Sequence, residues 1–275
     1  MKIILNRREK LNALNLDMIL AISSSLDQAE RDDSIDLVEI SSNCDRAFSS
    51  GADITIFLDQ KAALAMLTAE YQLNRKLIHF PKKSRALIDG LVMGGGVGIS
   101  FYTKELMVTK RFRFAMPEVK IGFFPDVGMS YFLPRLKYKV GWYLAMTGNS
   151  IGAADAAICG LIDKGDYGEG ELDLKEIDFD FAQLSVEEIR EKYAPDACPQ
   201  SVQVAYELMG WGQAQRSPLK ALELDLKLAK WFLAQKDIIE GVTCKVIEKG
   251  RVPNWALPKS GIATKIAKSL GHLQI

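Results

Sequence analysis

Short apolar runs alternate with segments of helical periodicity along the first half of the chain. The runs typical of buried strands cover residues 2–6, 37–41, 84–89, 107–109 and 113–115. Apolar spacing typical of one helix face predicts helices over residues 16–31, 62–80, 128–136 and 140–146, and a glycine-rich run predicts one more through residues 100–102. Strands that alternate with helices favour an α/β domain with substantial parallel pairing.

The pattern changes after Leu161. Residues 163–191 are acidic and rich in turn formers, which is typical of a surface connection or a loosely packed lobe. Helical periodicity returns over residues 205–235, with one apolar face formed by Leu219, Leu222, Leu226 and Leu233. Because such a face needs a partner, we expect the C-terminal helices to pack on the first lobe. A soft boundary near residue 165 divides the chain into a core (1–165) and an acidic connection with a helical region (166–275).

The composition is that of an ordinary globular protein. With 275 residues, 48% of them hydrophobic, the chain is long enough to bury a large core. Lysine plus arginine equals aspartate plus glutamate at 35 each, so no overall charge points to nucleic acid or to an anionic membrane surface. We therefore expect neither nucleic acid nor a membrane as a partner, and a local basic patch for any anionic ligand.

Cysteine usage and the first residues bear on the location of the protein. The four cysteines lie far apart without a Cys-x-x-Cys pair, so we expect reduced thiols in an intracellular compartment. The apolar run at residues 3–5 is too short for a signal-peptide core, and no uncharged apolar run approaches membrane-spanning length. These features predict a cytoplasmic protein that is neither exported nor anchored.

A glycine-rich run from Gly94 to Gly98 follows a predicted strand. It lacks the Gly-x-Gly-x-x-Gly spacing of a dinucleotide site and the Lys-Ser/Thr of a phosphate-binding loop. One interpretation is a tight turn or close helix packing. The other is a helix N-terminus whose bare N–H groups hold an oxygen that becomes negative. Residues 48–53 form a second turn of small residues, which either adds another N–H donor or merely lets Asp53 cap a helix.

Two acidic residues follow the glycine run at a separation of eight residues, Glu118 after Pro117 and then Asp126. Such a pair can act as acid and base on a ligand held at the glycines. Each also has a structural interpretation, a cap or ion pair for Glu118 and a helix N-cap for Asp126. The two histidines, His79 and His272, give little basis for a nucleophilic triad and form no metal-binding pair, so we expect no metal.

Several motifs of the chain occur in one characteristic order. They are Leu5-Asn6-Arg7, Leu11-Asn12-Ala13-Leu14, Gly51-Ala52-Asp53-Ile54, the Gly94–Gly98 run and Met116-Pro117-Glu118. With this combination, residues 1–165 resemble the enoyl-CoA hydratase/isomerase (crotonase) superfamily. Further motifs resemble the branch that hydrolyses 3-hydroxyisobutyryl-CoA, and they reach the C-terminal region. They include Gly122-Phe123-Phe124-Pro125-Asp126-Val127-Gly128, Glu240-Gly241-Val242 and Pro253-x-Trp255.

The resemblance implies a fold and a site. The fold is an α/β crotonase (ClpP-like) spiral of ββα units with a helical C-terminal region. In the site, the N–H groups of Ala52 and Gly95 hold a thioester carbonyl, Glu118 is the nucleophile or general base, and Asp126 assists protonation or positions water. The residues that the resemblance places around the substrate are Gly51, Asp53, Ile54, Glu70 and Gly94, with Lys249, Arg7 and Arg8 near the CoA phosphates.

One position separates the reactions of this superfamily. Where this chain has Gly98, the hydratases that it resembles have a second glutamate, which orients water and which a glycine cannot replace. We therefore expect acyl-CoA thioester hydrolysis, with the 3-hydroxyisobutyryl-CoA of valine breakdown as the substrate. An enoyl-CoA isomerase or hydratase and a non-catalytic acyl-CoA-binding protein are the alternatives.

The resemblance also bears on cofactors, assembly and location. Coenzyme A is part of the substrate, so no separate cofactor is expected. Relatives commonly form trimers or pairs of trimers, which predicts a homo-oligomer, and the mitochondrial matrix is the alternative to the cytoplasm. Relatives usually have a strand before the one at residues 2–6, so we expect this strand to be left as an open edge or to be covered by another segment.

Overall fold

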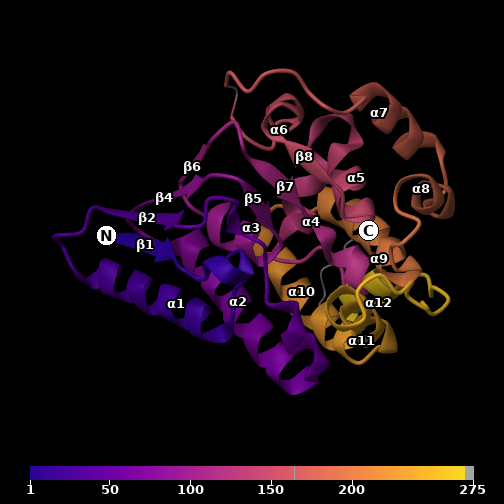
Figure 1. Ribbon diagram of the computed structural model, residues 1–275, viewed down its shortest axis with the longest axis horizontal. Coiled ribbons are helices and arrows are strands. Elements are labelled where there is room, and N and C mark those ends of the chain that lie inside the picture. The colour runs from indigo at the N-terminus through magenta and orange to yellow at the C-terminus, as the bar shows by residue number, and fades with distance from the viewer. Residues whose placement is uncertain (164, 270–275) are drawn as a thin grey trace.

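The computed structural model describes residues 1–163 and 165–269, which contain two four-stranded sheets (Figure 1). His272 lies outside the described residues. The strands of the first sheet are all parallel and run in the order β1 (Lys2–Leu5), β2 (Leu37–Ser42), β4 (Lys83–Ile88) and β6 (Glu105–Val108). The second sheet runs in the order β3 (Ala47–Ser49), β5 (Leu91–Met93), β7 (Arg113–Ala115) and β8 (Ser150–Gly152), with only the last pair antiparallel.

Pairs of strands alternate between the two sheets and are followed by helices. The chain passes from β2 to β3, from β4 to β5 and from β6 to β7, each time leaving the first sheet for the second. Helix α2 (Gln60–His79) follows the first pair and α3 (Gly95–Ser100) follows the second. This repeated order confirms the predicted α/β architecture of ββα units with parallel pairing. Strand β1 lies at the end of its sheet, with no described strand on its outer side.

The remaining helices surround the two sheets. They are α1 (Leu16–Arg31), α4 (Met129–Phe132), α5 (Val140–Thr147), α6 (Ala153–Cys159), α7 (Leu174–Gln183), α8 (Val186–Tyr193), α9 (Pro199–Gln213), α10 (Pro218–Leu233), α11 (Lys236–Val242) and α12 (Ile262–Ser269). Within the described part of the chain, none of the helices combines the length and the apolar character that crossing a membrane requires.

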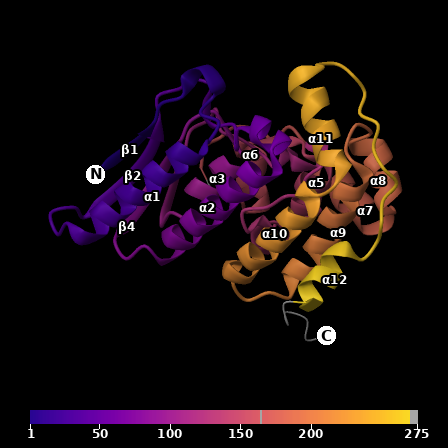
Figure 2. The same ribbon diagram turned by 90° about the horizontal axis from the view of Figure 1, so that it is seen from below.

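Helix α1 shows how the periodic pattern fixes an element. The Asn15 side chain caps its N-terminus by accepting a hydrogen bond from Met18 N, and Ile19, Ile22 and Leu26 of the predicted face are buried. The bounds agree with the prediction because both the cap and the apolar stripe are local signals. Figure 2 shows α1 and α2 lying side by side along the first sheet.

The second sheet was largely missed by the sequence prediction. Three of its strands, β3, β5 and β8, were not predicted, whereas β7, which also has three residues, was predicted. Strands of this length show too little alternation for a dependable assignment. Their pairing depends on partners far along the chain, such as Ala47 opposite Leu91. Long-range pairing therefore supplies what the local pattern lacked.

The acidic segment 163–191 differs from the predicted loose connection. It contains α7, which the Asp173 side chain caps, and the start of α8, which a capping box at Ser185 opens. Ile177 and Phe181, one helical turn apart on α7, are buried, and the Phe181 ring contacts Tyr143 of α5. This helix was not predicted from the sequence because its amphipathic pattern has few apolar residues, although they are well spaced, among many charged ones.

The C-terminal helices pack directly on the core, as their single apolar faces predicted. Helix α10 lies against α2, and α9 lies against α5 (Figure 2). Both α9 and α10 also contact α4. Gly212 of α9 comes so close to α4 that a Cβ there would lie 1.7 Å from the Ser130 carbonyl oxygen. This close approach brings residues of the C-terminal region next to the loop that follows Asp126.

Candidate active site

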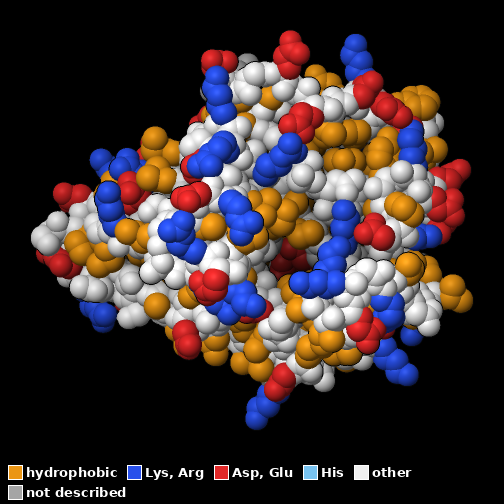
Figure 3. Space-filling model, viewed as in Figure 1, with side chains coloured by type: hydrophobic (Ala, Val, Ile, Leu, Met, Phe, Trp, Pro, Cys, Tyr) orange, Lys and Arg blue, Asp and Glu red, His pale blue; other side chains and the backbone are white. Residues whose placement is uncertain are grey.

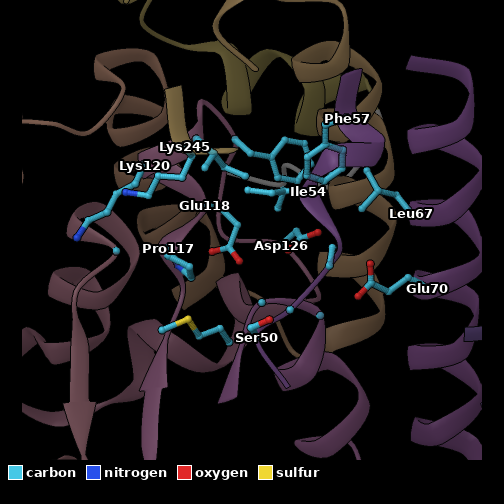
Figure 4. Close-up of a pocket in the computed structure, with 18 residues that line it drawn as sticks. Ser50, Ile54, Phe57, Leu67, Glu70, Pro117, Glu118, Lys120, Asp126 and Lys245 are labelled. Carbon is cyan, nitrogen blue, oxygen red and sulfur yellow. The ribbon is translucent and has the colours of Figure 1, made fainter. Parts of the chain in front are cut away.

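A cavity of about 370 Å³ lies where the second sheet, α2 and α3 meet. In Figure 3 the surface is hollowed near its centre, with acidic atoms inside the hollow and basic side chains at its rim. One side of the cavity is apolar and is formed by Ile54, Phe57, Leu67, Ile121 and Phe123. Three carboxyl groups line the same space, as Figure 4 shows: those of Glu70, Glu118 and Asp126. An apolar pocket with a few convergent polar groups is the usual form of a ligand site.

The glycine run brings bare backbone up to two of these carboxyl groups. Gly94 has a φ of 44°, and a Cβ on it would lie 2.6 Å from Glu118 Oε1. A Cβ on Gly95 would lie 2.0 Å from Glu70 Oε1. A side chain at Gly94 would be strained by the positive φ, and one at Gly95 would displace the end of the Glu70 side chain. Because Gly95 is the first residue of α3, its N–H has no acceptor within the helix and is available to a ligand in the cavity.

The second predicted turn forms the opposite backbone wall of the cavity. Gly51 and Ala52 line the cavity directly after β3. The bridge between Ala52 and Leu14 uses the Gly51 carbonyl and the Asp53 N–H, so the Ala52 N–H is outside its ladder of hydrogen bonds. Two backbone segments that are 43 positions apart in sequence, at Ala52 and Gly95, thus line one cavity.

Asp53 has a structural role at this turn. Its side chain accepts a hydrogen bond from Thr55 N at the start of the 3₁₀ helix Ile54–Leu58, and its Oδ2 forms a 2.7 Å ion pair with Arg7. This cap agrees with the structural interpretation of Asp53 from the sequence. Asp53 does not line the cavity, whereas its neighbour Ile54 does.

Glu118 is held at the start of the 3₁₀ helix Pro117–Ile121. Pro117 occupies the first helical position, where its missing N–H costs nothing. The Glu118 side chain is buried, and among residues 1–163 and 165–269 its Oε2 has no hydrogen-bond partner. Burial, followed by repulsion from Asp126 and Glu70, raises the pKa of Glu118 well above its usual range. A buried carboxyl with a free oxygen is prepared to contact a ligand or to take part in proton transfer.

Asp126 receives a hydrogen bond that the other two acids lack. The Tyr71 hydroxyl, on α2, donates to Asp126 Oδ2 at 2.7 Å. Burial raises the pKa of Asp126 to about 7, and the bond from Tyr71 limits this rise because it stabilises the ionised form. Asp126 can therefore exchange a proton near neutral pH.

Glu70 projects from the middle of α2 toward the cavity (Figure 4). It is buried, and its Oε1 has no hydrogen-bond partner within the described residues. Burial and the nearby Asp126 raise its pKa well above the usual range of a glutamate. Three coupled carboxyl groups in one buried space cannot all be ionised at neutral pH, so the cavity retains protons.

Gly98 does not line the cavity, and a side chain there would require Asn74 or Val127 to move. A Cβ there would lie 2.8 Å from Asn74 Nδ2 and 3.0 Å from Val127 Cγ1. Both of these residues are buried. At the position that the sequence resemblance assigns to a second glutamate, side chains of α2 and of the loop after Asp126 therefore pack closely against the glycine.

Two lysines that the sequence did not single out line the cavity. They are Lys120, whose Nζ donates to Asn149 Oδ1 at 2.8 Å, and Lys245, which lies in the π-helical turn Thr243–Ile247 (Figure 4). Burial lowers the pKa of Lys120. The predicted phosphate contact Lys249 lies outside the lining, four positions after Lys245. An irregular helical turn cannot be placed from periodicity, although such turns are frequent at functional sites.

Some of the other predicted residues line the cavity and some do not. Gly51, Ala52, Ile54, Gly94 and Gly95 all line the cavity with the three acids. Arg7 lines a different hollow beside β1 and α1, and Arg8 forms an ion pair with Asp45. Within the ranges that the structure describes, no group of three or more histidine, cysteine, aspartate or glutamate side chains is arranged to hold a metal ion.

Comparison with known proteins gives a consistent family. The family model described as enoyl-CoA hydratase/isomerase matches residues 1–169 and 171–266. The 3-hydroxyisobutyryl-CoA hydrolase, mitochondrial, of Rattus norvegicus is 43% identical over 164 residues, which cover 58% of this chain and 43% of that protein. The match thus spans less than half the length of that relative. The protein of the same name from Dictyostelium discoideum is 28% identical over 323 residues, covering 94% of this chain and 85% of that protein.

Solved structures agree with the fold. The crystal structure of an enoyl-CoA hydratase from Rhodobacter sphaeroides 2.4.1 has a TM-score of 0.85 and 26% sequence identity, and the match covers 97% of this chain and 93% of that chain. The helical C-terminal region is included in a match of this extent. Because the family model matches nearly the whole chain, the chain belongs to the enoyl-CoA hydratase/isomerase family and has the crotonase fold.

Proposed function

We propose that this protein is an acyl-CoA thioester hydrolase whose substrate is 3-hydroxyisobutyryl-CoA, an intermediate of valine breakdown. The proposal rests on one arrangement. Glu118 faces a cavity to which Ala52 and Gly95 present their backbone, while a glycine, Gly98, stands where a hydratase has its second acid. Of the three carboxyl groups that line the cavity, Glu118 is the one that the resemblance places beside the polarised carbonyl, and one carboxylate there is enough for thioester cleavage.

The backbone N–H groups would act on the carbonyl oxygen. In the proposed complex, the N–H groups of Ala52 and Gly95 form an oxyanion hole for the thioester. Negative charge develops on that oxygen during attack, and one such donor contributes roughly 2.7–4 kcal/mol to transition-state stabilisation. The apolar wall of the cavity strengthens the effect because it excludes water.

Glu118 would supply the attack in one of two ways. As a nucleophile, its carboxylate adds to the carbonyl carbon, the C–S bond breaks, and water then hydrolyses the resulting anhydride. As a general base, it takes a proton from water, whose oxygen attacks the same carbon. In both routes the thiolate of coenzyme A leaves and is protonated, and Asp126, with a pKa of about 7, is suited to deliver that proton.

The relatives support the proposed substrate and bear on location. The Rattus norvegicus and Dictyostelium discoideum relatives are both named 3-hydroxyisobutyryl-CoA hydrolase, and both are named mitochondrial. These names favour the mitochondrial matrix, and nothing in the comparisons favours the cytoplasm. A homo-oligomer and the use of no cofactor beyond the CoA of the substrate stay predictions.

Thiol release from 3-hydroxyisobutyryl-CoA tests the proposal. The wild-type protein should release free CoA, and Glu118→Gln should lower kcat by roughly 10²–10⁴-fold because the amide can neither attack nor accept a proton. Glu187→Gln, which changes a carboxylate that is 57% exposed on α8, is the matched control and should leave the rate unchanged.

Two further assays separate the alternatives. Hydration of crotonyl-CoA, or migration of the double bond in a 3-enoyl-CoA, without thiol release would replace the hydrolase with a hydratase or an isomerase. Binding of CoA esters with none of the three reactions would indicate a non-catalytic binding protein. A Glu118→Gln variant that hydrolyses at the wild-type rate would remove the role assigned to this residue.

A further inference from the structure

The turn after Asp126 has an unusual backbone. Val127 has a φ of 48° and Gly128 a φ of 75°, so two consecutive residues lie in the left-handed region. Gly128 adopts this conformation without penalty, but a β-branched valine does so only where its surroundings impose it. Because Asp126 is the residue before this pair, the direction of its side chain depends on whatever holds the turn.

Two side chains from other elements hold the turn by its backbone. Asp225 Oδ2, on α10, accepts a 2.7 Å hydrogen bond from Gly128 N. The Tyr102 hydroxyl donates a 2.8 Å hydrogen bond to the Val127 carbonyl oxygen. A Cβ on Gly128 would lie 2.0 Å from that hydroxyl. The turn is thus held by its backbone from two separate parts of the fold.

Asp225 is a buried acid outside the cavity, and its presence there needs a reason. It is fully buried but does not line the cavity, and its Oδ1 has no hydrogen-bond partner among the described residues. Burial and the nearby Asp126 raise its pKa well above the usual range of an aspartate. A buried acid is costly and adds nothing to the apolar core, so its single strong contact, the one with Gly128 N, accounts best for its presence.

We propose that Asp225 is a positioning residue of the active site, which holds the Asp126-Val127-Gly128 turn so that the Asp126 carboxyl faces the cavity and meets Tyr71. The C-terminal helical region thereby takes part in the chemistry without contacting the substrate. The kinetic part of this inference rests on the proposed hydrolase function. The geometric part does not.

Replacement of Asp225 by leucine and by asparagine provides the test. Leucine has a similar shape but cannot accept the Gly128 hydrogen bond, so kcat for thiol release should fall at least tenfold while KM changes less than twofold. Asparagine retains an acceptor oxygen and should restore kcat to within about threefold of wild type. Asp155→Leu is the matched control, because Asp155 is also buried and also accepts one backbone hydrogen bond, from Glu171 N at 2.9 Å. It should lower stability but not kcat.

A crystal structure of Asp225→Leu gives a readout that needs no activity. The inference expects the turn to relax and the 2.7 Å distance between the Tyr71 hydroxyl and Asp126 Oδ2 to lengthen. An unchanged turn, an unchanged kcat in Asp225→Leu, or a kcat that falls equally in Asp155→Leu would overturn it. If Asp225→Leu does not fold, Tyr102→Phe, which releases the same turn from its other side, should lower kcat in its place. Absence of thiol release by the wild type would instead remove the proposed function and leave the crystallographic test valid.

Discussion

The Tyr71 hydroxyl donates a 2.7 Å hydrogen bond to Asp126 Oδ2, which joins helix α2 to the loop that follows the 3₁₀ helix of Glu118. Both residues are buried, so the bond acts in a medium of low polarity and is stronger than it would be in water. It opposes the effect of burial on the Asp126 carboxyl, whose pKa remains near 7. The pair therefore provides a proton donor or acceptor that is suited to physiological pH.

Tyr71→Phe should shift the pH profile of thiol release toward higher pH. The hydrogen bond stabilises ionised Asp126, so its loss raises the pKa of Asp126 further above about 7. The limb of the kcat profile that Asp126 controls should move in the same direction. Tyr143→Phe, which changes another buried tyrosine on α5, should leave that limb in place. A limb that stays or moves to lower pH in Tyr71→Phe contradicts the assignment.

Asp126→Asn should stabilise the fold increasingly as pH rises. Burial raises the folded-state pKa of Asp126 to about 7, compared with about 3.9 for an unperturbed aspartate. Ionisation of such a group destabilises the native state, so wild-type stability is lost progressively between these two pH values. In urea unfolding, the free energy of unfolding of Asp126→Asn should exceed that of the wild type by more at pH 8 than at pH 4.5. The kcat of the variant should fall.

Glu240→Gln should change the stability of the protein with the opposite dependence on pH. An ion pair with Arg251 lowers the pKa of Glu240 to about 2, so Glu240 contributes stability above its unfolded pKa of about 4.3 and loses it as pH falls toward 2. The variant should be less stable than wild type at neutral pH, with a difference that disappears in acid. If the stability difference from the wild type changed with pH in the same direction for Asp126→Asn and Glu240→Gln, neither carboxyl would be the cause of the pH dependence.

Gly98→Ala should destabilise the protein by about 1–3 kcal/mol, because the new methyl group enters a filled space beside Asn74 and Val127. Gly210→Ala is the matched control. Gly210 lies in α9, where a Cβ would have nothing within 4 Å, so the substitution should stabilise by roughly 0.5–1 kcal/mol through helix propensity. Urea unfolding measures both changes. A Gly98→Glu variant that folds normally and hydrates crotonyl-CoA would contradict the packing described here.

Lys245→Ala should raise KM for the CoA ester by roughly three- to tenfold, or about 1 kcal/mol, without changing kcat. The reason is that Lys245 lies at the cavity, where it can meet a phosphate of coenzyme A. An N-acetylcysteamine thioester, which lacks those phosphates, should show no such effect, and Lys230→Ala on α10 serves as the control. A larger effect of Lys249→Ala would favour the position expected from the sequence.

Much of the site could be predicted because its elements are local. The glycine run, the Pro117-Glu118 pair and the cap at Asp53 each depend on residues that are neighbours in sequence. Glu70, which the resemblance placed near the substrate, also lines the cavity. Tyr71, Lys120, Lys245 and Asp225 were not assigned roles, because a tyrosine, lysine or aspartate in a helical segment has no local feature that distinguishes a site residue from an ordinary one.

The sequence by itself determined the alternation of strands and helices in the first half of the chain, the bounds of α1 and the family, since periodicity, capping and motifs act over a few residues. The tertiary structure alone decided that the Glu70 carboxyl approaches Gly95, that α10 reaches the Asp126 turn and that Asn74 and Val127 pack against Gly98. These relationships depend on how distant segments pack. Packing also sets the burial that raises the pKa of each carboxyl, and no local pattern contains that information.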